Sequence, residues 1–327
     1  MENKITKPKQ TSHQLIEKMK TEKGIQFIHT SEFDSEFYLS NVNNYLRTAS
    51  YRKNYQKHTK GPHSGKYIAL DFAYLQELST IDMHFRFIVS KMCLDIEHDL
   101  KVRMLKDLET DPTTDGYDIV ADFLSQNKYI IGKLEANSAS PFTCDLIRKY
   151  FDVQRIYNET KHKKENKISS YDDCPAWVLL EMLTFGDFIK FYEFYYSSRN
   201  YSKVSAPVIN LVKSLRNGAA HNNCILADLA HGTSYAPSEI SQDIAKINTI
   251  NSNQRRKKLA CRPMLEFTSL RYDYKIIVSD NVKYYRIQEL KELFFHRMLL
   301  HKDYFKNNEL IKSNYEFAAK IILAFFE

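Results

Sequence analysis

Apolar residues recur at steps of three and four through residues 70–108, a stretch that contains no Gly or Pro. The repeating positions are Leu78, Ile81, Phe85, Ile88, Met92, Ile96 and Leu100. This spacing places them on one face of an α-helix, so the pattern predicts one long amphipathic helix, or two helices joined by a bend. About 38 residues would span roughly 57 Å at 1.5 Å per residue. Asp111-Pro112 is expected to end the helix, because proline cannot continue it.

Shorter apolar stripes predict further helices on both sides of the long one. The expected ranges are 11–24, 31–48, 117–126, 141–157, 175–196, 205–222, 265–279, 284–301 and 307–326. Three polar stretches are expected to be irregular: an exposed loop at 51–66, a mobile loop at 160–173 and a looser region at 228–263. The Tyr, Ile and Val residues of 272–278 leave a strand open as an alternative there.

The composition favours a helical, globular protein. The chain has 327 residues, of which only 8 are Gly and 8 are Pro, so there are few breakers for the many turns of a β-sandwich or β-barrel. With 43% hydrophobic and 27% charged residues, the chain is not of the disordered class. We therefore expect a predominantly all-α bundle with a long central helix and additional N- and C-terminal helices. No repeat or linker divides the chain, so a single domain over 1–327 is predicted.

The cysteines and the apolar runs bear on the compartment. Five scattered cysteines, none in a C-x-x-C pair, argue against a zinc ribbon and against a disulfide framework, and they suit a reducing compartment. The N-terminus is polar and no apolar run of about 18 residues occurs. A cytoplasmic protein with no membrane association is expected.

The net charge of +7 and the pI near 8.9 suit a polyanionic partner such as RNA. The candidate RNA contacts are Lys161, Lys163, Lys164, Arg255 and Arg256. Charged runs are more often simply solvated, so we favour that interpretation over RNA contact. The 22 Tyr and 20 Phe could stack on unpaired bases, but aromatic side chains more often belong to the core.

Arg216 and His221 form the pattern R-x-x-x-x-H at the end of the helix expected over 205–222. Residues five apart lie roughly 140° apart around a helix, so the two share a side only if the turn is distorted or the long arginine reaches round. Asn217 and His221 are four apart and do share a face. Gly218 and the two alanines after it leave this part of the helix almost bare, so another helix or a phosphate can approach closely.

These residue types suit attack of an RNA 2′-hydroxyl on the adjacent 3′-phosphate. A histidine can move the proton, and an arginine can hold the negatively charged phosphorane through paired hydrogen bonds. No metal and no cofactor are expected, because the sequence has no H-x-x-x-H, no H-E-x-x-H and no tight acidic cluster. Chance matches to R-x-x-x-x-H are common, so the motif alone favours a structural His221 beside a surface Arg216.

The motif resembles that of a known family. The string L-R-N-G-A-A-H-N at residues 215–222 resembles the R-N-x-x-x-H motif of HEPN ribonucleases, in the L-R-N-x-x-A-H-N form of the Abi family of bacterial phage defence (the AbiD/AbiF group). Further stretches resemble the family in the same order. They are Lys7-Pro8 with Leu15-Ile16 and Gly24-Ile25, Asn44-Tyr45-Leu46-Arg47, Asp82-Met83-His84-Phe85-Arg86 with Ile96-Glu97-His98, and Pro175-Ala176-Trp177 with Thr184-Phe185-Gly186. Leu46 departs from the pattern, which usually has a second Tyr there, and roughly the last hundred residues match only loosely.

The resemblance implies a HEPN-like core at 67–227 that carries the motif, between an N-terminal helical region at 1–66 and a C-terminal one at 228–327. It implies a metal-independent endoribonuclease of abortive infection with Arg216 and His221 as the catalytic pair. HEPN domains usually build one site from two motifs, so a chain with one motif implies a homodimer. Some relatives are toxins held in check and some associate with a small non-coding RNA, so RNA is the expected partner.

Four residues are expected to support the pair. Asn217 is expected to play a supporting role, because its amide can position a phosphate or hold the histidine tautomer. Asn222 either contributes to the site or caps the helix end, and capping is favoured. Arg86 and Glu97 either orient the catalytic pair or form ordinary surface pairs with charges four residues away, such as Asp82.

Two other functions stay open. The protein could bind RNA, including a small non-coding RNA, without cutting it; salt-sensitive binding without products would indicate this. It could also be a toxin–antitoxin or scaffold component whose long amphipathic helix binds a protein partner.

Overall fold

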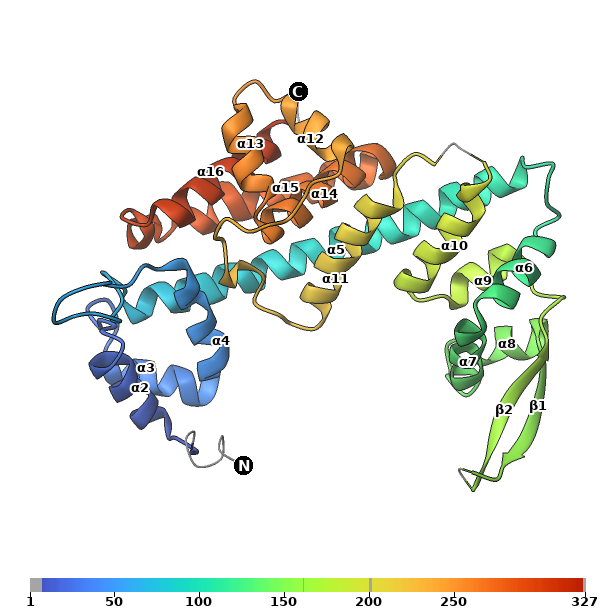
Figure 1. Cartoon of the computed structure of the whole chain (residues 1–327), viewed down its shortest axis with the longest axis horizontal. Helices are drawn as coiled ribbons and strands as arrows, with labels where there is room; N and C mark the ends of the chain where they lie inside the picture. Colours follow the sequence, from blue (N-terminus) through green and yellow to red (C-terminus); the bar gives the residue numbers. More distant parts are fainter. Residues whose placement is uncertain (1–7, 161, 200–201, 326–327) are drawn as a thin grey trace. The chain divides into compact units, whose positions relative to one another are not determined.

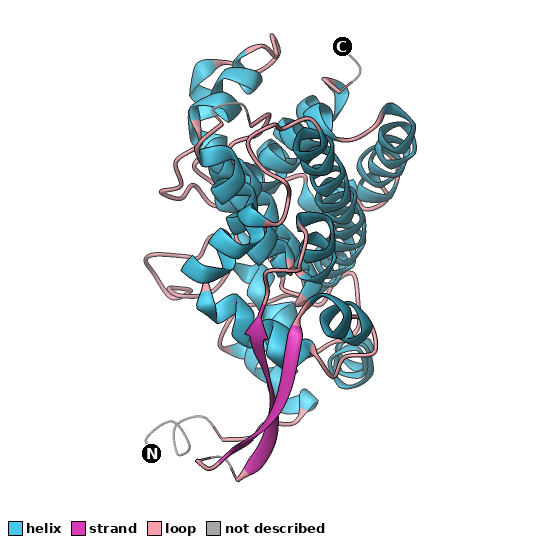
Figure 2. Cartoon of the chain, turned by 90° about the vertical axis from the view of Figure 1, so that its right-hand side faces the viewer, coloured by secondary structure: helices cyan, strands magenta, loops and turns pink. Residues whose placement is uncertain are grey.

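A computed structural model describes residues 8–160, 162–199 and 202–325 (Figure 1). It is 64% helical, with 15 helices and one small two-stranded sheet among the described residues (Figure 2). The predicted all-α class is therefore confirmed. Two residues singled out in the sequence lie outside the described ones: Lys7 of the family-like opening and Lys161 of the predicted RNA contacts. Across the described ranges, no helix combines the length and the apolar character that a bilayer crossing requires.

The chain forms two compact units. Unit 1 comprises Met1–Cys93, Ser214–Lys275 and Asp280–Glu327, and unit 2 comprises Leu94–Lys213 and Ile276–Ser279. Each unit is thus assembled from stretches that are distant in the sequence.

The predicted long helix is a single one, α5 (Phe72–Glu109), whose first part belongs to unit 1 and whose second part belongs to unit 2 (Figure 1). The Asp71 carboxylate accepts the Ala73 N–H at 2.9 Å and so satisfies a donor of the first turn. Every member of the predicted stripe from Leu78 to Leu100 is buried. The apolar period therefore identified the buried face of this helix correctly.

The N-terminal part of unit 1 is more broken than predicted. Its elements are α2 (Ser12–Thr21), α3 (Glu32–Phe37), a π-helical turn (Tyr38–Val42), α4 (Tyr45–Ser50) and a 3-10 turn (Tyr51–Asn54). Thr11 forms the expected N-terminal cap of α2. The single helix expected over 31–48 is wrong, because the Asn44 side chain accepts the Arg47 N–H and starts a new helix. The exposed loop expected over 51–66 is wrong at its start, where Tyr51 is fully buried.

The C-terminal part of unit 1 contains more helix than predicted. Its elements are η3 (Ile225–Ala227), α12 (Ser238–Ala245), α13 (Ser252–Leu259), α14 (Arg262–Ile277), α15 (Asp280–Phe295), η4 (Arg297–Leu299), η5 (Lys302–Phe305) and α16 (Glu309–Leu323). The region 228–263 holds two helices rather than irregular chain, and Asn251 caps the second of them. The strand alternative over 272–278 is wrong, because this stretch continues α14 and buries Tyr274 and Ile277 on one helical face.

Unit 2 contains the sheet, which the sequence did not reveal. Its elements are α6 (Asp118–Gln126), α7 (Lys128–Asn137), α8 (Cys144–Tyr150), β1 (Asp152–Asn158), β2 (Lys163–Ser170), α9 (Ala176–Met182) and α10 (Phe185–Ser197). The helix expected over 141–157 stops at Tyr150, and residues 163–170 of the loop expected over 160–173 form the strand β2. The two strands pair antiparallel with Tyr157 opposite Lys164. Strand pairing is a contact between segments, so helix periodicity could not signal it.

The helix expected over 175–196 is interrupted between α9 and α10. Leu183 is extended, and the Thr184 side chain accepts the Asp187 N–H to begin α10. Aromatic side chains of α6 and α10 fill the core of unit 2, where the rings of Phe123 and Phe191 are 4.9 Å apart. These rings belong to the core, which is the role that the sequence analysis favoured for most aromatic residues.

Candidate functional site

The motif lies at the C-terminal end of α11 (Ala206–Ala220). The apolar face of this helix is buried through Val208, Val212 and Leu215. Arg216 and Asn217 lie in its last turns and are half-buried, whereas His221 directly follows the helix and is exposed. The buried face thus fixes the helix, and the motif residues lie where the helix meets solvent.

Asn222 ends the helix in the way predicted for it. Its φ is +56°, in the left-handed region that asparagine tolerates better than most residues. The Asn222 N–H donates to the Ala219 carbonyl at 3.0 Å, and the Asn223 N–H donates to the Gly218 carbonyl at 2.8 Å. This pair of bonds is a Schellman cap. His221 is therefore the cap residue itself, at the point where the regular helical turn is lost.

Asn217 contacts both members of the predicted pair. One guanidinium nitrogen of Arg216 donates to Asn217 Oδ1 at 3.2 Å, and the backbone N–H of His221 donates to the Asn217 carbonyl at 2.9 Å. The amide side chain thereby orients the guanidinium, while its backbone holds the start of the cap. The Asn217 side chain thus contacts Arg216, and the Asn217 backbone makes the last regular helical bond to His221.

A buried ion pair on α5 anchors the chain that follows the motif, residues 222–229, which we name the post-motif segment. The Asp82 carboxylate accepts Arg86 at 2.5 Å, the Tyr51 hydroxyl at 2.6 Å and the Leu226 N–H at 3.2 Å. The Arg86 guanidinium also donates to the Asn223 carbonyl at 3.3 Å. Asp82 is fully buried and Arg86 is only 6% exposed. The interpretation of Asp82–Arg86 as an ordinary surface pair is therefore wrong, because this face of α5 is covered by the post-motif segment.

Burial shapes the protonation of this pair. Burial raises the pKa of the Asp82 carboxyl above its ordinary value, against the lowering effect of the Tyr51 hydroxyl and the Arg86 guanidinium. Burial and the neighbouring Asp82 carboxylate raise the pKa of Tyr51, so its hydroxyl stays protonated and remains a donor. The Asp82 carboxylate is thus a single acceptor that is surrounded by the donors of Tyr51, Arg86 and the Leu226 backbone.

The N-terminal region adds contacts that sequence reasoning missed. The Arg47 guanidinium donates to the Asn222 carbonyl and, at 3.3 Å, to the Asn222 side-chain oxygen. The buried Asn54 donates to the Leu226 carbonyl and accepts the Leu229 N–H, each at 2.8 Å. Arg47 belongs to the family-like stretch Asn44-Tyr45-Leu46-Arg47, and this was the available signal. The N-terminal region and α5 therefore converge on the residues just after His221.

Residues 37–227 match the family described as Abi-like protein, which is more than half of the chain. The chain belongs to this Abi-like family. Membership suggests a part in abortive-infection defence. No curated protein and no solved structure matches the chain.

The matched range of this Abi-like protein begins within α3 and ends at Ala227, the last residue of η3. It therefore contains Arg47, Asp82, Arg86 and the motif, which are the parts that contact one another in unit 1. The departure at Leu46 falls on a side chain that is 79% exposed, so it alters no core packing.

The other predicted residues belong to other elements of the two units. Glu97 belongs to unit 2 and pairs with Lys101 at 3.6 Å, so its role in orienting the motif stays a prediction. Lys163 and Lys164 are exposed on β2, also in unit 2. Arg255 and Arg256 lie on α13 of unit 1, half-buried and exposed respectively. Within the described ranges, no three His, Cys, Asp or Glu side chains gather into a group that could hold a metal ion.

Proposed function

We propose that this Abi-like protein is a HEPN-type endoribonuclease that acts in abortive infection through Arg216 and His221. The observation that carries the proposal is the link through Asn217, which bonds the guanidinium of Arg216 and the backbone of His221 at an exposed helix end. The anchored post-motif segment supports it further, because catalytic groups must be held in place to be effective.

The proposed reaction needs only proton transfer and charge stabilisation. The 2′-oxygen of the RNA bonds to the neighbouring phosphorus and loses its proton, and the bond from phosphorus to the 5′-oxygen breaks as that oxygen gains a proton. His221 moves a proton, and Arg216 stabilises the negative phosphorane. The products are a 2′,3′-cyclic phosphate and a 5′-hydroxyl. A homodimer would bring two such motifs together, so that one histidine serves as base and the other as acid.

The decisive experiment is cleavage of a mixed single-stranded RNA in the presence of EDTA. We expect products ending in 2′,3′-cyclic phosphate from the wild type and none from His221→Ala or Arg216→Ala. His231→Ala is the matched control, since it removes another exposed histidine of unit 1. A DNA strand of the same sequence should stay intact, because it lacks the attacking hydroxyl. Full activity of His221→Ala would overturn the proposal.

The hairpin of unit 2 favours a second candidate function, RNA binding without cleavage. Side chains of alternate residues and of their cross-strand partners share one face of a hairpin. Arg155 and Tyr157 pair with Asn166 and Lys164, so one face carries two cations beside a tyrosine that is 57% exposed. Such a face suits phosphates and base stacking. Salt-sensitive RNA binding that is lost in Arg155→Glu/Tyr157→Ala, without products from the wild type, would favour this candidate over the nuclease.

A further inference from the structure

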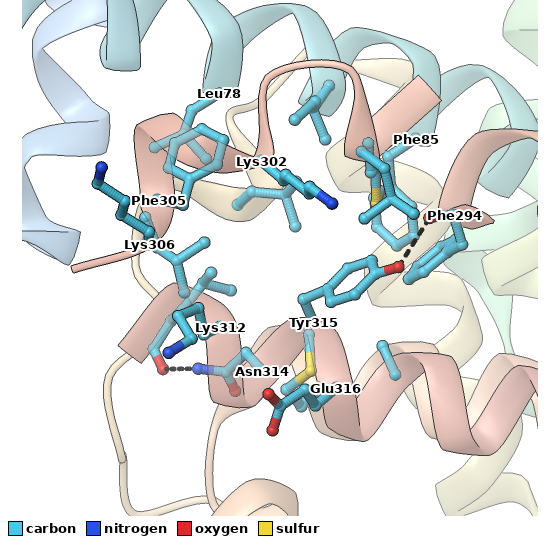
Figure 3. Close-up of a pocket in the computed structure, with 18 of the residues that line it drawn as sticks. Leu78, Phe85, Phe294, Lys302, Phe305, Lys306, Lys312, Asn314, Tyr315 and Glu316 are labelled. Atoms are coloured by element: carbon cyan, nitrogen blue, oxygen red, sulfur yellow. Dashed lines mark hydrogen bonds between the residues drawn. The ribbon is translucent and has the colours of Figure 1, made fainter. Parts of the chain in front are cut away.

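Unit 1 contains an apolar pocket that has no part in the proposed cleavage (Figure 3). Its volume is about 350 Å³, within the range of small-molecule sites. Side chains from α5, α14, α15, η5 and α16 form its wall. They include Leu78, Phe85, Phe267, Phe294, Phe305 and Ala318.

The wall lies inside the unit rather than on its surface. Phe85, Phe267 and Phe294 are each at most 3% exposed. Three other lining residues, Met298, Leu299 and Tyr315, are only half-buried, so an apolar chain would enter from their side. The pocket therefore suits a small ligand better than a docked protein.

The rim of the pocket is charged and has a positive excess. Three lysines line it, Lys302, Lys306 and Lys312, against two acids, Asp303 and Glu316. Lys312 pairs with Glu309 at 2.7 Å, whereas Lys302 and Lys306 are exposed and lie four residues apart beside the opening. In Figure 3 the Lys302 side chain lies over the pocket and Lys306 lies at its edge. An anionic group could meet the Lys302 ammonium while an apolar chain fills the interior, and Lys306 adds positive charge at the edge.

The pocket also borders the post-motif segment. Leu226 and Leu229 form part of its wall. Asn314 of α16, another lining residue, donates to the Leu229 carbonyl at 3.1 Å (Figure 3). A ligand packed against these two leucines would hold the segment that follows His221 more firmly.

We infer that this pocket binds an amphipathic anion, an apolar chain with one acidic head group, and that its occupancy stabilises the post-motif segment. The ligand class follows from the apolar wall and the lysines at the rim. The inference does not depend on RNA cleavage, because binding and backbone protection can be measured directly.

The test uses decanoate, decanol and decylamine, which share a chain length and differ in head-group charge. Calorimetry should show decanoate binding most tightly to the full-length protein. Lys302→Glu/Lys306→Glu should weaken decanoate about threefold to tenfold and leave decanol unchanged. Lys246→Glu/Lys257→Glu is the matched control, because it makes the same charge change at exposed lysines of unit 1 that do not line the pocket.

Two further measurements locate the ligand. Met298→Trp should fill the pocket from a half-buried position of its wall and abolish binding of both decanoate and decanol, with the helical circular dichroism unchanged. Decanoate should slow amide hydrogen exchange in residues 222–229 of the wild type. No binding of decanoate, equal binding of decylamine, or undiminished binding by a folded Met298→Trp protein would each overturn the inference.

Discussion

Arg86 and Asn223 are 137 residues apart in the sequence, and the Arg86 guanidinium donates to the Asn223 carbonyl at 3.3 Å. The same guanidinium pairs with the buried Asp82. This one side chain therefore connects the long helix to the backbone two residues after His221. The position of the motif thus depends on α5 as well as on its own helix.

Arg86→Met should destabilise unit 1 strongly. It leaves the buried Asp82 without its cation, and breaking such a pair costs about 3–5 kcal/mol in the free energy of unfolding. Urea unfolding measures the change. Asp82→Asn/Arg86→Met should cost much less than the sum of the two single changes, because no uncompensated charge remains. A loss below about 0.5 kcal/mol for Arg86→Met would contradict the buried pair.

Arg47→Ala should reduce RNA cleavage more than stability. Arg47 is half-exposed, and its bonds hold the carbonyl and side chain of Asn222, the left-handed residue that follows His221. We expect faster amide exchange at Asn222 and Asn223 and, for the proposed nuclease, a several-fold lower cleavage rate, with the unfolding midpoint nearly unchanged. Lys60→Ala, at an exposed position of unit 1, serves as the control. Cleavage equal to that of the control would show that Arg47 does not help to position His221.

Gly218→Ala should preserve the fold. An added Cβ would meet only Ile225 Cγ1, at 4.0 Å, and alanine favours helix over glycine by up to about 1 kcal/mol. Thermal unfolding should therefore show equal or higher stability. Gly218→Leu should also fold, but it should cut less RNA if the bare helix surface admits a phosphate. Undiminished cleavage by Gly218→Leu would show that the RNA backbone approaches a different part of the protein.

Asp111 in unit 2 should make stability depend on acidity. Burial opposes the effect, but hydrogen bonds from Thr113 and Arg199 lower the pKa of Asp111 to about 2. A lowered carboxyl pKa contributes stability that is fully present above the ordinary value near 4 and is lost as the pH falls towards 2. Asp111→Asn should thus be less stable than the wild type at pH 7, and the difference should shrink between pH 4 and pH 2. A constant difference over that window would exclude this linkage.

Asp273 should have the opposite effect. Both carboxyl oxygens are buried without a hydrogen-bond partner among the described residues, and burial raises the pKa of Asp273 well above its ordinary value. Such a carboxyl lowers stability progressively as the pH rises above the ordinary value. Asp273→Asn should therefore become more stable relative to the wild type from pH 4 to pH 8. If the two proteins differ by the same free energy of unfolding at pH 4 and at pH 8, Asp273 is not held protonated by the fold.

Local pattern was sufficient for features that depend on neighbouring residues. The period of three and four residues identified α5 and its buried face, and the small number of Gly and Pro residues indicated the helical class. Asn222 was predicted to cap α11 because asparagine tolerates the left-handed backbone that a helix end requires. The motif itself could be recognised from residues 215–222 because its members are contiguous.

Pairing across the chain was decided only by the tertiary structure. The strands β1 and β2 replaced a predicted helix and a predicted loop, because each strand needs its partner's hydrogen bonds. The Asp82–Arg86 pair looked like a surface pair until residues 222–226 were found to cover it. The sequence by itself thus determined the helical class, the long helix and the motif, since these follow from propensity and spacing along the chain. What surrounds the motif depends on contacts between residues more than a hundred positions apart, and only the folded chain brings those residues together.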